Sequence, residues 1–354
     1  MNPQTSAPTS AEPPQMPLES TSAGTKLIEE SFDSELARRH RYGMIFEWVC
    51  WLATWGSVVI LGVLIATMAW QAMGWLTPKF LVSMPRRNPA DAGILPGIVG
   101  TFWLILLTAI LSVPLGVGAA IYLEEYSKPT LLTKFIQLNI ANLAGVPSIV
   151  YGILGFTAFV RMFGLAKSEY LINLGIGSLQ LTLPFGRTVI SGALTLALLS
   201  LPVVIIASQE ALRSVPPSLR HASLALGATK WQTIWHQVLP SALPGMMTGV
   251  ILAMSRAIGE TAPLVAIGAA TYITFTPGRL NSVSEAITRP DKLAQVPFDS
   301  FTTIPMQIYG WINEAKPEFQ HVAAAAILVL LVILLISNGL AIFIRQHFQK
   351  KVRW

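Results

Sequence analysis

The sequence predicts an all-α membrane protein with six membrane-spanning helices, and its composition and its pattern of apolar runs carry this prediction. Of the 354 residues, 53% are hydrophobic and only 12% are charged, with a mean hydropathy of +0.57. Soluble domains carry about 25% charged residues. The net charge of +6 makes the chain basic, but its lysines and arginines form no stripe, so we do not expect it to bind nucleic acid.

Six apolar runs are each close to the length that crosses a bilayer. Trp48 and Trp75 fall near the two ends of the first run, as interfacial aromatic residues do. Six spans place both termini on one side, and four Lys or Arg residues before the first span and four after the last one indicate that this side is the cytoplasm. The expected spans are 45–75, 98–123, 135–160, 183–208, 245–273 and 322–344.

Three parts of the chain differ in composition. Residues 1–43 are a cytoplasmic tail, rich in Pro, Ser and Thr at its start, without the apolar core of a signal peptide. Within it the charged segment 26–42 suits a disordered tail or a short surface helix. Residues 44–345 form the transmembrane domain, and 346–354 form a basic cytoplasmic tail. The single cysteine, Cys50, lies in an apolar run and excludes a disulfide within the chain.

The loop at 209–245 is polar enough to leave the membrane. In it the small residues Ala222 and Ser223 precede Gly227, and an amphipathic run at 231–238 follows. The pattern predicts two short helices joined by a turn at Gly227, with Pro240 ending the second helix before the next span. A helix lying on the membrane surface is the alternative.

Arg256 and Glu260 are the first candidate for a polar group inside the membrane. Arg256 lies about ten residues into the fifth expected span, and hence near the midplane, where a charge is costly and normally faces the bundle or a water path. Glu260 shares its helix face and can neutralise it until an entering anion competes. The guanidinium's fork of donors suits a tetrahedral oxyanion. A purely structural ion pair is the alternative.

The second candidate is the break at Gly145-Val-Pro-Ser148 in the third span. Pro147 removes a backbone donor and frees a carbonyl, and Ser148 adds a hydroxyl beside it. The glycines could equally serve only close helix packing. Arg161 and Arg187, near the outer ends of the third and fourth spans, suit guidance of anions as well as snorkelling to the interface.

Nothing in the sequence indicates an enzyme. No Gly-Lys pair occurs, so the chain has no phosphate-cradling loop of the kind that binds ATP. Nucleophile, base or metal ligands do not cluster, because the histidines are scattered. We therefore expect no cofactor and no metal site in this chain, and any energy must come from another chain through the polar loop. The histidines are His40, His221, His236, His321 and His347.

Several stretches resemble the PstA-type permeases of phosphate ABC importers. They are Arg-Ala-Ile-Gly-Glu-Thr-Ala-Pro-Leu at 256–264, Gly-Val-Pro-Ser-Ile-Val-Tyr-Gly at 145–152 and Pro-Gly-Ile-Val-Gly-Thr at 96–101. The polar loop is similar to the EAA loop of ABC permeases at Ala222, Gly227, Leu239 and Pro240. It departs from that pattern at His221, Ser223 and Gln237. The resemblance covers about residues 45–345.

This resemblance implies the type I ABC importer permease fold with a cytoplasmic coupling helix. It implies a permease subunit of an inorganic phosphate importer in the bacterial inner membrane, with a PstC-like sister permease, a PstB-like ATPase dimer that uses ATP and Mg, and a PstS-like binding protein outside. A permease for another oxyanion, such as molybdate, sulfate or phosphonate, is the alternative. The expected substrate-path residues are Arg256, Glu260, Thr261, Ser148 and Arg187, and the expected ATPase-coupling residues are Glu210, Ala222, Ser223, Gly227, Lys230, Leu239 and Pro240.

Overall fold

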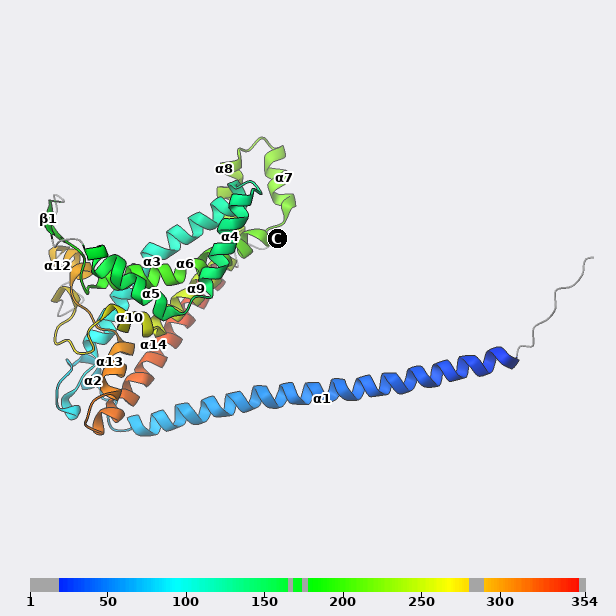
Figure 1. The fold of residues 1–354 in the computed structure, drawn as a ribbon, viewed down its shortest axis with the longest axis horizontal. Coiled ribbons are helices and arrows are strands. Elements are labelled where there is room, and N and C mark those ends of the chain that lie inside the picture. The colour runs from blue at the N-terminus through cyan, green and yellow to red at the C-terminus, as the bar shows by residue number, and fades with distance from the viewer. Residues whose placement is uncertain (1–18, 165–167, 174–177, 280–289, 350–354) are drawn as a thin grey trace, which may run out of the picture. The chain divides into compact units, whose positions relative to one another are not determined.

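The computed structural model describes residues 19–164, 168–173, 178–279 and 290–349 (Figure 1). The chain divides into two units, residues 1–66 and 67–354, and each is considered by itself. The described residues of the first unit, 19–66, belong to the long helix α1 (Glu19–Ala72), and the remaining residues of this helix, 67–72, are counted with the second unit. Residues 26–42, expected to be a disordered tail or a short surface helix, lie inside this one continuous helix. Residues 1–18 and the end of the basic tail, 350–354, lie outside the described residues.

The second unit is a helical bundle with one small β-hairpin. Its elements are α2 (Pro78–Val82), η1 (Pro89–Asp91), α3 (Leu95–Ile121), η2 (Tyr122–Tyr126), α4 (Leu131–Ala144), α5 (Ser148–Gly155), η3 (Phe156–Val160), η4 (Met162–Gly164), β1 (Ser168–Asn173), β2 (Ser178–Leu183), α6 (Val189–Arg213), α7 (Pro217–Ala225), α8 (Lys230–Thr233), η5 (Ile234–Val238), α9 (Leu239–Gly259), α10 (Ala262–Ile267), η6 (Pro277–Arg279), α12 (Pro290–Gln295), η7 (Val296–Phe298), α13 (Ile304–Ile312) and α14 (Glu318–Gln349).

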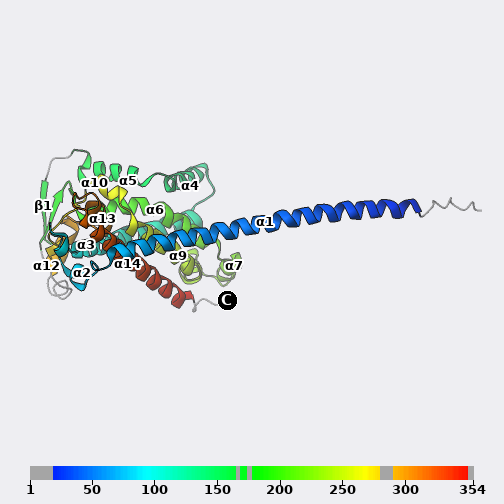
Figure 2. The ribbon, with the colours of Figure 1, turned by 90° about the horizontal axis from the view of Figure 1, so that it is seen from below.

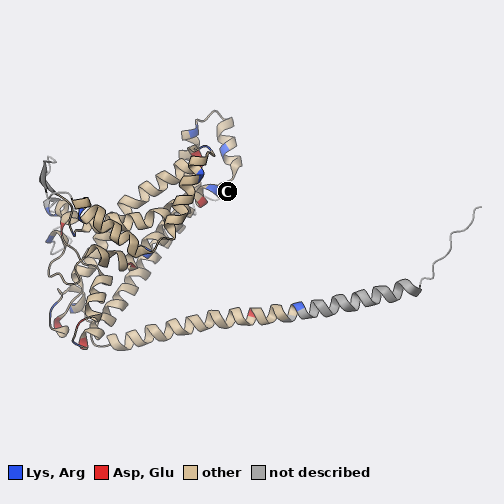
Figure 3. Ribbon diagram, in the orientation of Figure 1, with Lys and Arg blue, Asp and Glu red and all other residues tan. Residues whose placement is uncertain are grey.

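Five helical stretches of the described chain are long and apolar enough to cross a membrane, and a bent pair makes a sixth. The bent pair consists of α4 with α5–η3, whose axes differ by 103°. The expected class of α-helical membrane protein is therefore confirmed, with six spans when the bent pair is counted as the third. Charged residues gather mainly toward the two ends of the second unit (Figure 3). The five stretches are Tyr42–Ala72, Leu95–Tyr126, Val189–Arg213, Lys230–Gly259 and Glu318–Gln346.

The fourth span starts later than expected, at Val189 rather than 183, and continues to Arg213. The antiparallel hairpin of β1 and β2 precedes it, with Ser168 opposite Leu183. Strand β2 reads Ser-Leu-Gln-Leu-Thr-Leu, a strict alternation of polar and apolar residues, which is the period of a strand. The expectation of a span beginning at 183 was wrong because it counted the last apolar residue of this strand as helix.

The fifth span is also shifted, from 245–273 to Lys230–Gly259. Pro240 does not end the second coupling helix, so that expectation was wrong. The turn before it, η5, is π-helical, and the Leu239 amide bonds to the carbonyl of Ile234, five residues back. A π-turn shifts the hydrogen-bond ladder, and Pro240 then sits in the first turn of α9, where a missing amide costs little.

The two central helices, α3 and α6, pack against each other and carry buried hydroxyl side chains that bond to the backbone of their own helix. Thr108 on α3 donates to the carbonyl of Leu104, and Thr195 on α6 donates to that of Ser191, at 2.7 and 2.8 Å. Each hydroxyl thus finds its hydrogen-bond acceptor on its own helix and needs none from a neighbouring helix. Helices with few bulky residues at their contact can then pack closely in an apolar surrounding.

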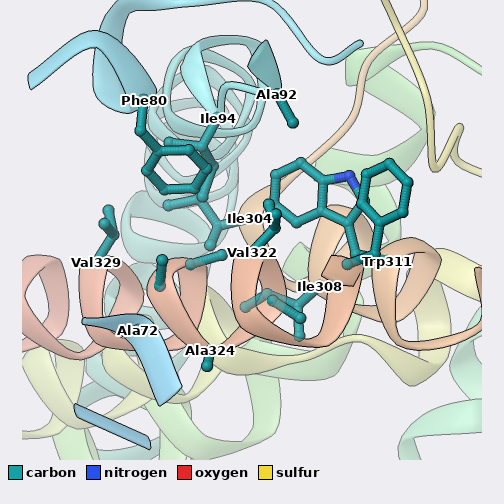
Figure 4. Packing of buried hydrophobic residues seen from close by; sticks show 14 residues of the cluster. Ala72, Phe80, Ala92, Ile94, Ile304, Ile308, Trp311, Val322, Ala324 and Val329 are labelled. Carbon is teal, nitrogen blue, oxygen red and sulfur yellow. The ribbon is translucent and has the colours of Figure 1, made fainter. Parts of the chain in front are cut away.

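An apolar cluster closes the end of the second unit that carries α2 and α13 (Figure 4). Phe80 of α2 packs against Trp311 of α13, with ring centroids 6.1 Å apart. Ile94, Ile304 and Val322 are buried beside them. Burial of each such side chain contributes about 1.5–3 kcal/mol, and the cluster therefore fixes the long loop between α1 and α3 against the starts of α13 and α14.

Candidate functional sites

Two motifs that lie far apart in the sequence meet in the bundle, because α5 packs against α10 (Figures 1 and 2). At their contact, a Cβ added to Gly152 would lie 2.6 Å from the Cβ of Ala266 and 2.7 Å from the Cα of Pro263. Such distances are not possible for a side chain, so the close approach requires glycine at position 152. Gly152 therefore serves close helix packing, whereas the path role of Ser148 in the same motif stays a prediction.

The bend between α4 and α5 is held by a specific contact. Pro147 is the N-cap of α5, and the Tyr151 hydroxyl donates to the carbonyl of Leu143, in the last turn of α4, at 2.8 Å. That bond satisfies one of the carbonyls that a helix end leaves unpaired. Ser148 is the first residue of α5 and is half-buried. Its hydroxyl therefore stands at a fixed break in the third span.

Arg256 and Glu260 form the expected ion pair, with 3.2 Å between Nε and Oε1. Their backbone differs from the expectation. Helix α9 ends at Gly259, so Arg256 lies in its last turn and Glu260 follows it in extended conformation. The reasons given for a position about ten residues into the span and for a shared helix face were therefore wrong. The arginine side chain is 51% exposed and that of the glutamate 18%, so an anion can approach the guanidinium while the carboxylate stays held.

The short helix α10 connects the other expected path residues. Thr261 directly precedes it and is half-buried. Arg187 is exposed and lies against Gly268 at its other end, where an added Cβ would come within 2.9 Å of Arg187 Nε. The structure thus places Glu260 and Thr261 at one end of α10, Arg187 at the other, and Ser148 on the helix that packs against it. Arg187 and Arg256 are not brought to one point.

A second site lies at the opposite end of the bundle, where α7 and α8 form the expected pair of short helices. Gly227 joins them with a φ of +83°, in the left-handed region. The hydroxyls of Ser223 and Thr233 bond across the pair at 2.9 Å, and Thr229 and Gln232 form a capping box at the start of α8. This hairpin, residues 217–238, is called the coupling hairpin below.

The coupling hairpin exposes apolar side chains at its tip and on one flank. Leu226 is 89% exposed at its tip, and Trp231 and Trp235 stack with centroids 5.5 Å apart on its flank. Ile234 and Val238, on the other side of the same helix, are buried. Exposed apolar patches of this kind mark sites of interaction. Ala222 is also exposed, whereas Glu210 lies in α6, not in the loop as expected, and pairs with Arg213 at 3.2 Å.

The turn η2 holds the coupling hairpin through residues that the sequence analysis missed. Glu125 accepts from Arg220 at 2.8 Å, and Glu124 accepts from Arg213 at 2.9 Å. Lys230 lies 5.2 Å from the ring of Tyr126. Three consecutive residues at the end of α3 therefore contact the hairpin and the helix that leads into it. One signal in the sequence could have indicated this contact. It is the pair of adjacent acids after the second span together with the arginines at and after the end of the fourth span.

Arg220 does more than pair with Glu125. Its Nη1 donates to the carbonyl of Val215 at 2.7 Å, and its Nη2 donates to that of Leu212 at 2.9 Å. The guanidinium therefore binds the open carbonyl end of α6 and the acid at the end of α3 together. Such a fork joins three elements in one place, which a lysine could not do.

The bundle of apolar helices, the charged break inside it and the exposed hairpin at one end define a multi-span membrane permease. The chain belongs to the family of binding-protein-dependent transport system inner membrane components, whose family model matches residues 112–354. It is 30% identical over 278 residues to the probable ABC transporter permease protein YqgI of Bacillus subtilis, covering 78% of this chain and 86% of that protein.

Two further comparisons support the same conclusion. The phosphate transport system permease protein PstA of Yersinia pestis is 30% identical over 296 residues, which cover 84% of this chain and 86% of that one. A solved bacterial ABC transporter involved in the import of the acidic polysaccharide alginate shares the fold, with a TM-score of 0.50 at 14% identity over 91% of this chain and 99% of that one. The expected PstA-type resemblance and ABC importer permease fold are thereby confirmed.

Proposed function

We propose that this chain is the permease subunit of an ATP-driven importer of inorganic phosphate and forms half of the path through the bacterial inner membrane. Its 30% identity to a phosphate transport permease over most of both chains supports the substrate. The single structural observation that carries the proposal is Arg256, a half-exposed guanidinium held by Glu260 at a helix break among apolar helices. A charge so placed serves passage of an anion.

In the path, the acid and the anion compete for one guanidinium. Glu260 neutralises Arg256 while the path is empty, and a phosphate oxygen takes over the fork when it arrives. The carboxylate then repels the anion and keeps binding weak enough for release, as a site used for passage requires. Thr261 and Ser148 add hydroxyls near the same break, and Arg187 stands at the far end of α10.

The coupling hairpin is the docking surface for a separate ATPase dimer, which binds ATP and Mg and hydrolyses the nucleotide. Its exposed apolar tip and flank fit a groove on that partner. A movement of the hairpin reaches α3 through Glu125 and α6 through Arg220. Coupling of this kind requires that the ATPase contact the two states of the path differently.

The orientation and the remaining partners follow from this assignment. The coupling hairpin and both termini face the cytoplasm, and the end with α2 and α13 faces outward, where a PstS-like binding protein delivers phosphate. A PstC-like sister permease supplies the other half of the path.

Uptake of labelled phosphate by whole cells tests the proposal. Cells that lack the chain should lose high-affinity uptake and regain it when the chain is restored with its operon partners. Excess unlabelled phosphate should compete, whereas molybdate, sulfate and methylphosphonate should not. Competition by one of these anions as strong as that by phosphate would favour the alternative, a permease for that oxyanion. Uptake that persists without any ATPase subunit would contradict the proposed energy source.

A further inference from the structure

A pocket of about 470 Å³ is lined by residues next to α2 and α13. These two helices lie at the end of the second unit opposite the coupling hairpin (Figure 1). Three cationic side chains line the pocket, those of Arg86, Arg87 and Lys316, together with the acid Glu314 and the aromatic residue Trp311. The arginines follow α2, and the lysine lies in the joint between α13 and α14. Segments far apart in the sequence thus bring their positive charges to one hollow.

A hydrogen bond and aromatic packing hold the walls of this pocket in place, although its charged side chains are exposed. Tyr272, which also lines it, donates from its hydroxyl to the carbonyl of Pro85 at 2.9 Å and so holds the arginine loop against the segment that follows α10. Trp311 packs on Phe80 in the buried cluster of Figure 4. The backbone that carries the cations is therefore set before any ligand arrives, which reduces the cost of binding.

Among the described residues, the three cations form no ion pair with a neighbouring acid, although the charge of Arg86, after that of Lys79, contributes to lowering the pKa of Asp91. Within the part of the chain that the structure describes, neither arginine nor Lys316 has an acidic partner within 4.0 Å. Lys79, on α2 at the same end, differs because it pairs with Asp91 at 2.8 Å, and this hydrogen bond and charge lower the pKa of Asp91 below its usual value. Unpaired cations in a hollow attract and concentrate anions.

We propose that this pocket captures a small oxyanion at the outer mouth of the chain, before the anion reaches Arg256. The guanidinium forks of Arg86 and Arg87 match the geometry of a tetrahedral oxyanion, and Glu314 keeps the capture weak. Tyr272, which lines the pocket, belongs to the segment that follows α10 in the chain. The inference rests on the proposed function for the identity of the anion, inorganic phosphate, and for the outward direction of this end.

A direct test is protection of Lys316 from acetylation. The complete importer complex, purified in a maltoside detergent without binding protein or ATP, is treated with an amine-acetylating reagent, and mass spectrometry follows Lys316 and Lys79. Inorganic phosphate at about twice its dissociation constant should slow acetylation of Lys316 about threefold and leave Lys79 unchanged. Chloride at equal ionic strength should protect neither lysine. The double variant Arg86→Gln, Arg87→Gln should remove the protection.

Measurements of phosphate uptake by cells with the same variants are the second test of this pocket. Arg86→Gln with Arg87→Gln should raise KM for phosphate about tenfold with little change in the maximal rate, because capture precedes passage. The effect should shrink at high salt, since exposed charges are screened. Lys79→Gln removes a cation that is already paired at the same end and should leave KM unchanged.

The outcomes separate this inference from the proposed function. Normal uptake with no phosphate protection of Lys316 overturns the pocket and leaves the function standing. Protection without any phosphate uptake by the parent chain supports the pocket and contradicts the function. Equal protection by chloride, protection that survives in the double variant, or protection only by added phosphatidylglycerol would each overturn capture of free oxyanion at this place.

Discussion

Arg256 and Glu260 differ in how far their side chains are buried, and this difference lets an anion reach the arginine. The glutamate is mostly covered, directly behind the end of α9, and the arginine reaches out from the last turn of that helix. An anion can therefore displace the carboxylate from the guanidinium without moving the backbone. A purely structural ion pair would more often bury both side chains. Removal of one partner from such a buried pair destabilises the folded protein by about 3–5 kcal/mol.

The first prediction concerns Arg256→Lys. The lysine keeps the charge but loses the planar fork, so phosphate uptake should fall about tenfold or more, the equivalent of about 1.4 kcal/mol of transition-state stabilisation. Initial uptake rates in cells measure this loss, and copurification of the ATPase shows that the complex assembles. Arg161→Lys is the matched control, because Arg161 is exposed and its guanidinium lies over the ring of Phe156, 5.0 Å from the centroid. Loss of assembly with normal uptake per complex would assign Arg256 a structural role.

The second prediction concerns Gly227, at the turn of the coupling hairpin. Its φ of +83° strains any residue with a Cβ by about 1–2 kcal/mol, although no atom lies within 4 Å of the place a Cβ would take. Gly227→Val should therefore abolish most uptake through the backbone alone. Gly227→Asn, with a side chain that tolerates this conformation, should retain most of it. Membrane immunoblots check insertion, and equal uptake by the valine and asparagine variants would contradict the role of the turn.

At the scale of elements, the end of α3 is the part through which the coupling hairpin reaches the bundle. The contact is charged on both sides and partly covered, with Arg220 at 22% and Glu125 at 9% exposure. Helix α3 in turn packs along α6. A push on the hairpin therefore reaches two central helices through one guanidinium rather than through a flexible joint.

The third prediction follows for Glu125→Gln. It removes the charge that faces Arg220 and should weaken the contact by about 1–3 kcal/mol, less than a fully buried pair because Arg220 keeps its two carbonyls. In proteoliposomes, phosphate transported per ATP hydrolysed should fall severalfold while the ATPase stays bound. Asp91→Asn, in an exposed pair at the other end, should leave this ratio unchanged. A normal ratio in Glu125→Gln would mean that force reaches the bundle elsewhere.

At the scale of the molecule, the apolar runs were sufficient to predict the class and the number of spans, and the polar loop around Gly227 predicted the coupling hairpin. Two expected helix bounds were wrong, and each error has a local cause. Pro240 looked like a helix end because a sequence does not show that the turn before it is π-helical. Residue 183 looked like the start of a span because Leu183 is apolar, whereas it is the last residue of strand β2. In both cases hydrogen bonding beyond the local pattern decided the structure.

The contact between the candidate path residues was predicted correctly, but their position along the fifth span was not. The spacing of Arg256 and Glu260 predicted their ion pair, but the pair forms across a helix end that Gly259 closes. The packing of Gly152 on Pro263 joins two motifs that no local pattern relates. Arg220 was missed for the same reason, because its partner lies 95 residues away in the chain. Contacts of that range depend on the whole bundle.

The last prediction tests the direction of the molecule in the membrane. In a Cys50→Ala background, which removes the exposed native thiol, single cysteines replace Ala90, in the loop after α2, and Leu226, at the tip of the coupling hairpin. A membrane-impermeant maleimide should label position 90 in intact spheroplasts and position 226 only in inside-out vesicles. The apolar helices between them should block passage of the reagent, since they span the bilayer.

The ATPase gives this experiment a second arm. Leu226→Cys should be protected in inside-out vesicles that retain the ATPase subunit and should react fully after that subunit is stripped, because 89% of the Leu226 side chain is exposed in the chain alone. Labelling of both positions from the same side would contradict the six-span orientation. Labelling of 226 that is indifferent to the ATPase would leave the orientation intact and place the docking surface elsewhere on the hairpin.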